Sequence, residues 1–459
     1  MKHQILMKVY VICSALVFGY HTVAAEQPDD YVVACYVVAS SATRPGSSKF
    51  KVTSAAANLC TDVIFGFAKI SVPKRALKVT NQEEKIILAE LLQLKNESPD
   101  LRLLLALGGE ETGDAPFDEI VKTWSVLQDF SKNVAAMLRH RGFDGLEIAW
   151  TTQDYRKKNS ISRLCQALHD AFLKESSSSG EEKLLLTFTA IPNDLTVKPM
   201  YNPTLINQYV DRITVLAFNY ENPSEPLALH SSPLHNTDSS AGGVSQSGSM
   251  KWWTRNGVPA KKLILGLAAF GRTFVKAAQR GNMRPSDKKS IWSDGPPGPY
   301  TGLSGYLSFY EICQMEQRGQ LLKKWNAQWK APMAFGQLNN SLSLVSFQDS
   351  RSFKEKAFFA KSEGYGGIMI WSLDLDDFDG KFCNSSSYPL LHSAVSVLRK
   401  KSVPDLFSIE KLMELTSFFG IPVMWVLLIA SIGVSYNFGF IPLKKEAEKI
   451  LDPKSYRVY

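Results

Sequence analysis

The 459-residue sequence lacks the patterns that mark several large classes of enzyme. It has no cluster with metal-ligand spacing, no glycine-rich phosphate loop and no serine–histidine arrangement for nucleophilic catalysis. The seven histidines are scattered, and we interpret His230 as structural rather than as a metal ligand. We therefore expect neither a metal nor a cofactor.

Long blocks of one charge sign are also missing. The net charge of +8 is spread along the chain without an extended run of Lys or Arg, so nucleic-acid binding is not expected. No extended low-complexity region interrupts a composition that is typical of globular proteins. The length suits one large α/β barrel with additions, or two or three smaller domains.

Both ends of the chain carry long apolar stretches. Residues 1–25 contain early lysines, an apolar centre and small residues at the end, which is typical of a cleavable secretory signal. Residues 415–443 contain no charged residue and precede a basic segment, 444–459. This pattern favours a linker at 401–414, one transmembrane helix and a cytoplasmic tail. A buried core helix is one alternative; a glycolipid-anchor signal is another, although a basic tail argues against it.

These ends predict a single-pass type I membrane protein, at the cell surface or in a secretory-pathway membrane. Its ectodomain would lie outside the cytosol. Three Asn-x-Ser sequences would then be usable glycosylation sites, those of Asn96, Asn339 and Asn384.

Residues 143–151 are predicted to form a short buried strand around which the rest of the chain is organised. Successive side chains of a strand point to opposite faces. Here one face is large and apolar, and the other carries an acid, a methyl and a hydroxyl: Leu146, Ile148 and Trp150 alternate with Glu147, Ala149 and Thr151.

At this strand the chain resembles the family 18 glycoside hydrolases, the chitinases and chitinase-like lectins. Their fourth barrel strand carries Asp-Gly-x-Asp-x-Asp-x-Glu. Asp144 and Gly145 match its start, Glu147 replaces the second Asp, Ala149 the third, and Thr151 the catalytic Glu. In the family that Glu protonates the leaving oxygen, and the third Asp orients the substrate acetamido group, which acts as nucleophile. Because Ala and Thr can do neither, the resemblance implies a chitinase fold without chitinase activity.

A relocated acid is the alternative. Glu147 lies four residues before Thr151, roughly 13 Å deeper along an extended strand, and is interpreted as a buried, hydrogen-bonded carboxylate. Asp154, on the loop after the strand, and Glu110 are the other candidate acids. An active glycosidase on an unusual substrate would need one of them.

Further stretches match the family in order from about residue 30 to 398. Strands alternate with helices, which predicts a (β/α)8 TIM barrel over residues 26–400 with its site at the carboxyl ends of the strands. A small α+β insertion is expected at about 273–337. The resemblance also pairs Cys35 with Cys60 and Cys313 with Cys383, and Cys165 is left as a free thiol whose default state is buried.

The resemblance further implies a ligand cleft, for which the matching positions are Tyr36, Asn219, Arg272, Glu311 and Trp371. Several positions depart from the family. Ser40 and Glu110 replace tryptophans, Phe218-Asn219 replaces the Tyr-Asp pair of the sixth strand, and Phe270 replaces a Tyr. From the residue alone, Trp371 is as consistent with barrel core as with ligand contact.

We therefore expect a catalytically inactive, membrane-anchored chitinase-like protein that binds a chito-oligosaccharide-like glycan or a protein partner. An active glycosidase with a relocated acid is one alternative. The other is a structural or assembly protein of a secretory-pathway membrane, for which the barrel is only a stable body.

Overall fold

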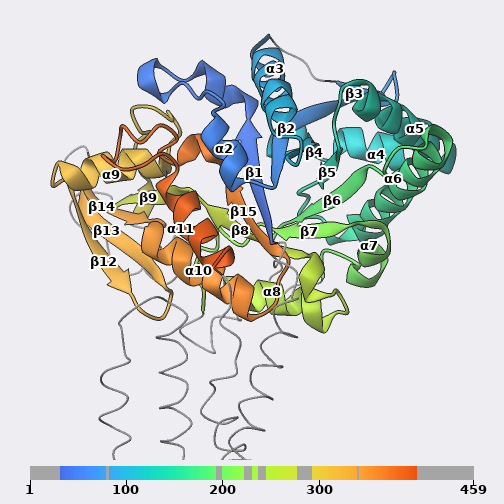
Figure 1. The fold of residues 1–459 in the computed structure, drawn as a ribbon. Coiled ribbons are helices and arrows are strands. Elements are labelled where there is room, and N and C mark those ends of the chain that lie inside the picture. Colours follow the sequence, from blue (N-terminus) through green and yellow to red (C-terminus); the bar gives the residue numbers. More distant parts are fainter. Residues whose placement is uncertain are drawn as a thin grey trace, which may run out of the picture. The chain divides into compact units, whose positions relative to one another are not determined.

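Eight parallel strands close into a barrel in the computed structural model, which describes residues 31–78, 82–192, 199–221, 230–235, 244–276, 292–338 and 341–400. In order around the barrel these strands are β1 (Val32–Val38), β2 (Asp62–Ser71), β4 (Arg102–Gly108), β5 (Gly145–Ala149), β6 (Leu185–Ala190), β7 (Arg212–Val215), β8 (Leu263–Ala268) and β15 (Gly367–Trp371). β1 pairs with both β2 and β15, which closes the ring (Figure 1). The predicted (β/α)8 barrel is confirmed.

Helices cover the outside of the barrel: α2 (Ser54–Leu59), α3 (Gln82–Glu97), α4 (Ala115–Val121), α5 (Trp124–His140), α6 (Lys158–Ser179), α7 (Pro203–Tyr209), α8 (Gln246–Arg255), α10 (Ser350–Ser362) and α11 (Pro389–Leu398). α5 shows why these segments are helical. Thr123 caps its first turn by accepting a hydrogen bond from the Val126 amide, at 3.3 Å. Its buried stripe recurs every three or four residues, at Leu127, Phe130, Val134 and Leu138.

A second sheet follows the seventh barrel strand. Its strands are antiparallel in the order β10 (Trp292–Asp294), β9 (Phe270–Lys276), β14 (Ser341–Ser346), β13 (Ala331–Leu338) and β12 (Leu321–Asn326), and β11 (Tyr306–Ser308) pairs with β9. One helix, α9 (Phe309–Gln317), accompanies it. Only Ala269 separates β8 from β9, so the insertion sheet continues directly from the barrel wall. The insertion was predicted at about 273–337, and the sheet itself runs from 270 to 346.

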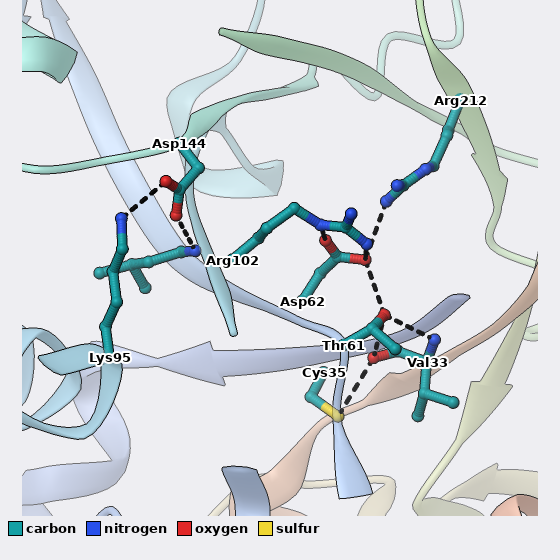
Figure 2. A network of polar contacts seen from close by, with 9 residues as sticks. Val33, Cys35, Thr61, Asp62, Lys95, Arg102, Asp144 and Arg212 are labelled. Carbon is teal, nitrogen blue, oxygen red and sulfur yellow. Dashed lines mark hydrogen bonds and ion pairs between the residues drawn. The ribbon is translucent and has the colours of Figure 1, made fainter. Parts of the chain in front are cut away.

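The amino-terminal end of the barrel is tied together by ion pairs between neighbouring segments (Figure 2). Asp62, 1% exposed at the start of β2, accepts hydrogen bonds from Arg102 and from Arg212, the latter at 2.8 Å. Asp144, the first residue of the family motif, accepts from Lys95 Nζ at 2.6 Å and from the Leu103 amide at 2.7 Å. Asp144 therefore holds strands together and lies at the opposite end of the barrel from any active site of this fold.

Two disulfides are present, Cys35–Cys60 and Cys313–Cys383. The first joins β1 to the residue that ends α2, and the second joins α9 to the segment that follows β15. Cys165 is a buried free thiol on α6, and burial raises its pKa to about 12. A thiol in that state is a packing residue with little thiolate character.

Among the described residues, no helix is long and apolar enough to cross a bilayer. The longest of them, α6, has 22 residues, but it carries charges along its length, including Arg163, Asp170 and Glu175. A span requires about 20 predominantly apolar residues. The finding contradicts the predicted single-pass type I membrane localisation, which we withdraw. The predicted signal (1–25), linker (401–414), span (415–443) and tail (444–459) lie outside the described residues.

The predicted glycosylation sites lie in different settings. Asn96 is exposed near the end of α3, and Asn384 is exposed in the loop before α11. Asn339 lies outside the described residues. Exposure is compatible with modification, and glycosylation at these positions stays a prediction.

Candidate functional site

The carboxyl end of β5 lies where family members carry their catalytic carboxylates. Ala149 is the last residue of the strand; it pairs with Gly108 of β4, and its carbonyl accepts a hydrogen bond from the Gly109 amide at 3.0 Å. Thr151 follows two residues later and is half-buried. A methyl and a hydroxyl thus stand at this strand end, and neither is an acid.

Glu147 is enclosed inside the barrel, as predicted from its position on the inward face. The hydroxyls of Thr187 and Thr189 on β6 donate to its two carboxylate oxygens. Burial raises the pKa of Glu147, and hydrogen bonds from Thr187, Thr189 and Thr214 oppose that rise. This carboxylate is held below the barrel mouth by its neighbours, which argues against its acting at position 151.

Asp114, at the start of α4, was not identified from the sequence. It accepts hydrogen bonds from Trp150 Nε1 at 2.7 Å and from the Thr152 hydroxyl at 3.0 Å. These two donors flank Thr151, so Asp114 fixes the turn that leaves β5. An Asp directly before an apolar helix signals a helix start, but it does not predict this contact with the loop after the neighbouring strand β5.

Asp154, one of the two candidate replacement acids, belongs to the surface turn after β5. Its carboxylate accepts hydrogen bonds from the Arg156 guanidinium at 2.8 and 3.0 Å and from the Arg156 amide at 3.0 Å. These hydrogen bonds, the guanidinium ones first, lower the pKa of Asp154 to about 2. It is ionised at any physiological pH and is therefore unsuited to donate a proton.

Three aromatic rings form the floor of the barrel mouth. Trp371 at the end of β15 lies with its ring centroid 4.7 Å from that of Tyr36 and 5.9 Å from that of Phe67. Tyr36 is fully buried, while Phe67 and Trp371 are half-buried. Phe67 was missed in the sequence. Gly109, with φ +79°, makes room for it, since a Cβ there would lie 2.9 Å from the Phe67 ring.

Arg272 on β9 is 7% exposed and is the centre of a charged cluster. Its Nε donates to Glu221 Oε1 at 2.6 Å, and its terminal nitrogen donates to Asp294 Oδ1 at 3.2 Å. The guanidinium carbon lies 4.0 Å from the centre of the Tyr306 ring. The resemblance identified Arg272 but not these three partners, which come from a loop after β7 and from two strands of the insertion sheet.

The remaining two predicted cleft residues, Asn219 and Glu311, differ in exposure. Asn219 is exposed on the loop after β7, in the left-handed backbone region at φ 61° that Asn tolerates better than most residues. Beside it Phe218 is buried, with its ring centroid 5.7 Å from that of Phe270. The packed rings of Phe218 and Phe270 thus form an apolar wall where the resemblance implies polar side chains.

Glu311 is 1% exposed and is satisfied by the chain itself. Its carboxylate accepts from the amides of Tyr300, Thr301 and Ser308 at 2.8 to 2.9 Å, and from the hydroxyls of Thr301 and Ser308. The Ser308 contacts form a capping box at the start of α9. No acceptor is left over for a sugar, and we omit Glu311 from the proposed site.

A closed parallel barrel, an antiparallel insertion after its seventh strand and an aromatic floor at the carboxyl ends define a glycoside-hydrolase type of barrel protein. Comparison with known families narrows this class. The sequence profile described as "Glycosyl hydrolases family 18" matches residues 32–376. The chain belongs to this family of chitinases and chitinase-like proteins.

Relatives of several kinds are similar to the chain. It is 36% identical to mouse Chitotriosidase-1 over 368 residues, covering 78% of this chain and 76% of the relative. It is 33% identical to sheep Oviduct-specific glycoprotein over 387 residues, covering 82% of this chain and 67% of the relative. Human Chitinase-3-like protein 2 is 29% identical, over 79% of this chain and 91% of the relative.

Solved structures agree in fold. Human YKL-39, described as "a pseudo-chitinase with retained chitooligosaccharide binding properties", superposes with a TM-score of 0.72 at 28% identity, covering 80% of this chain and 99% of that chain. The Ostrinia furnacalis Group IV chitinase in complex with allosamidin gives a TM-score of 0.70 at 27% identity, with 80% and 99% covered. The similarity therefore includes both a pseudo-chitinase and a chitinase.

Proposed function

We propose that this protein is a catalytically inactive member of family 18 that binds a chito-oligosaccharide-like glycan at the carboxyl end of its barrel. The observation that carries the proposal is the end of β5, where Ala149 and Thr151 lie; the resemblance aligns them with the family's orienting Asp and catalytic Glu. Without a proton donor at the leaving oxygen and a group to orient the acetamide, the substrate-assisted reaction has no catalyst.

None of the three nearby acids offers a replacement with supporting geometry. Glu147 is enclosed and hydrogen-bonded to Thr187 and Thr189, and Asp154 is paired with Arg156 in its ionised form. Glu110 is exposed on the short turn after β4. An exposed carboxyl lacks the enclosed, apolar surroundings of a glycosidase general acid.

Glycan binding is supported by the half-buried rings of Trp371 and Phe67. Flat rings at a partly open surface suit the apolar faces of pyranose sugars, because they remove apolar area from water without requiring hydrogen bonds. The resemblance places Trp371 at the family's cleft-floor Trp, and the similar YKL-39 is described as binding chitooligosaccharides.

The test is calorimetric titration of the full-length protein with partially deacetylated chito-oligosaccharide hexamers, followed by mass spectrometry of the same samples. We expect heat of binding and intact sugar. Cleaved sugar, once contaminating enzyme is excluded, would contradict the assignment as inactive. The absence of heat with any chito-oligosaccharide would remove glycan binding and favour a protein partner.

A further inference from the structure

Among the described residues, the cluster around Arg272 contains more carboxyl groups than guanidinium groups, and burial raises the pKa of one of these carboxyl groups, that of Glu221. Arg272 contributes one guanidinium, while Glu221 and Asp294 each contribute a carboxylate within hydrogen-bonding distance of it. The cluster lies where the barrel wall passes into the insertion sheet, because Arg272 on β9 pairs with Tyr306 on β11. It therefore borders the carboxyl end of the barrel.

Glu110 adds a third carboxylate from another part of the mouth. It begins the turn η3 (Glu110–Thr112) after β4 and is exposed. Burial raises the pKa of the Tyr306 hydroxyl; the Arg272 charge lowers it, and the charges of Glu221, Glu110 and Asp294 raise it further. Glu110 thus acts on the same ring as the Arg272 cluster, so the part of the chain that the structure describes places three carboxyl groups and one guanidinium around Tyr306.

Glu221 supplies an independent sign that the cluster is incomplete. Its side chain is 4% exposed, and one oxygen accepts from Arg272 at 2.6 Å. The other oxygen, Oε2, is buried without a hydrogen-bond partner. Because the two oxygens belong to one carboxyl group, Oε2 also lies within the cluster. A buried carboxylate oxygen without a partner is costly, and a nearby cation lowers that cost.

The groups expected to hold an acetamide are missing from the same mouth. Phe218 and Asn219 stand where the resemblance places Tyr and Asp, and Ala149 stands where it places the orienting Asp. Phe218 packs against Phe270, and its phenyl ring carries no hydroxyl or carboxylate that could bind a ligand. Compared with what the resemblance implies, the described part of the mouth offers fewer side-chain groups for an acetamide and carries more carboxyl groups than cations beside the Tyr306 ring.

We propose that this site prefers a cationic amino sugar, a chito-oligosaccharide with free ammonium groups, over the N-acetylated form. The inference rests on the proposed function and specifies its ligand. The exposed carboxylate of Glu110 and the half-exposed one of Asp294 accept hydrogen bonds from ligand ammonium groups, while the unpaired oxygen of Glu221 adds favourable potential behind them. The sugar ring lies against the aromatic floor.

The test compares two probes on the full-length protein: the hexamer of glucosamine and the hexamer of N-acetylglucosamine, each titrated calorimetrically. We expect the glucosamine hexamer to bind about tenfold more tightly, and its affinity to fall as salt rises, because exposed charge pairs are screened. Tighter or equal binding of the acetylated hexamer would overturn this inference and leave the proposed function standing. If neither hexamer binds, both fail.

Substitutions locate the effect. The double change Glu110→Gln and Asp294→Asn should weaken the glucosamine hexamer about three- to tenfold and leave the acetylated hexamer unchanged. Glu111→Gln is the matched control, since Glu111 is the adjacent exposed carboxylate on the same turn. Equal losses for both sugars, or no loss in the double variant while its thermal unfolding stays unchanged, would contradict the assigned carboxylates.

Discussion

The two ends of the barrel differ in how their charges are balanced. At the amino-terminal end three carboxylates each contact a cation: Asp62 lies between Arg102 and Arg212, Asp144 contacts Lys95, and Asp211 contacts Lys183 at 2.8 Å. In the cluster beside the carboxyl end, the described residues place one guanidinium, that of Arg272, between the carboxyl groups of Glu221 and Asp294, and Glu110 acts on the same Tyr306 ring.

Hydrogen bonding differs in the same direction. Asp144 and Asp211 also accept from backbone amides of the neighbouring strands, those of Leu103 and Leu186. Glu221, by contrast, leaves one buried oxygen without a partner. In this fold the amino-terminal end serves stability and the carboxyl end serves ligands. These two clusters follow that division.

The largest effect should come from the amino-terminal end. Asp62→Asn leaves two guanidinium groups beside a neutral side chain that is 1% exposed, and we expect a loss of about 3 kcal/mol in the free energy of unfolding. Urea denaturation measures it. Asp129→Asn is the control, because its pair with Arg75 is exposed on both sides and should change stability by less than about 0.5 kcal/mol. Equal effects would remove the distinction between the two kinds of pair.

The aromatic floor should respond in binding. Trp371→Ala is expected to weaken a chito-oligosaccharide about tenfold, since one stacked ring contributes roughly 1–3 kcal/mol by analogy with stacked bases. Titration of the full-length protein measures the change, with circular dichroism as the check of folding. Trp124→Ala, on the outer helix α5, should leave affinity unchanged. An unchanged affinity for the folded Trp371 variant would place the glycan elsewhere.

The carboxyl side of the barrel also carries a buried carboxyl group, that of Asp376, whose effect on stability should depend on pH. Burial raises the pKa of Asp376 from 3.8 to about 7, although the amides of Leu391, Asp377 and Leu390 donate to it. The folded state therefore holds this proton longer than the unfolded state. The contribution of Asp376 to the free energy of unfolding is fully present below about pH 4. It decreases by up to about 1.4 kcal/mol per pH unit as the pH rises toward 7.

Asp376→Asn tests that slope. The free energy of unfolding of the wild type, minus that of the variant, should decrease between about pH 4 and pH 7. Urea denaturation across this range provides both values. A difference that stays constant with pH would show that Asp376 titrates normally in the folded protein.

The smallest effect is expected at Asp154. Its ion pair with Arg156 lies on a surface turn, so Asp154→Asn should change neither sugar affinity nor the midpoint of thermal unfolding measurably. The same titration and a melting curve suffice. Turnover of a chito-oligosaccharide by the wild type that this substitution abolishes would identify Asp154 as a relocated acid and contradict the proposed function.

Prediction from sequence was strongest where it rested on a local pattern, the alternation of side chains along one strand. The inward position of Glu147 follows from the period of residues 143–151, and its burial agrees with it. The resemblance supplied the barrel and the cysteine pairs, which the structure contains. The membrane localisation was wrong: it was inferred from apolar composition near the chain ends, and the structure describes no helix that could span a bilayer.

The sequence by itself determined which chemical groups are missing at the mouth, because Ala149 and Thr151 carry no carboxylate in any conformation. Only the tertiary structure decided what replaces them. Glu221 and Arg272 are 51 residues apart and meet because the barrel closes and β9 continues into the insertion sheet. Glu311 matches a cleft position of the family, yet amides of its own segment donate hydrogen bonds to both of its carboxylate oxygens. Contacts between distant strands depend on closure and register, which no local pattern encodes.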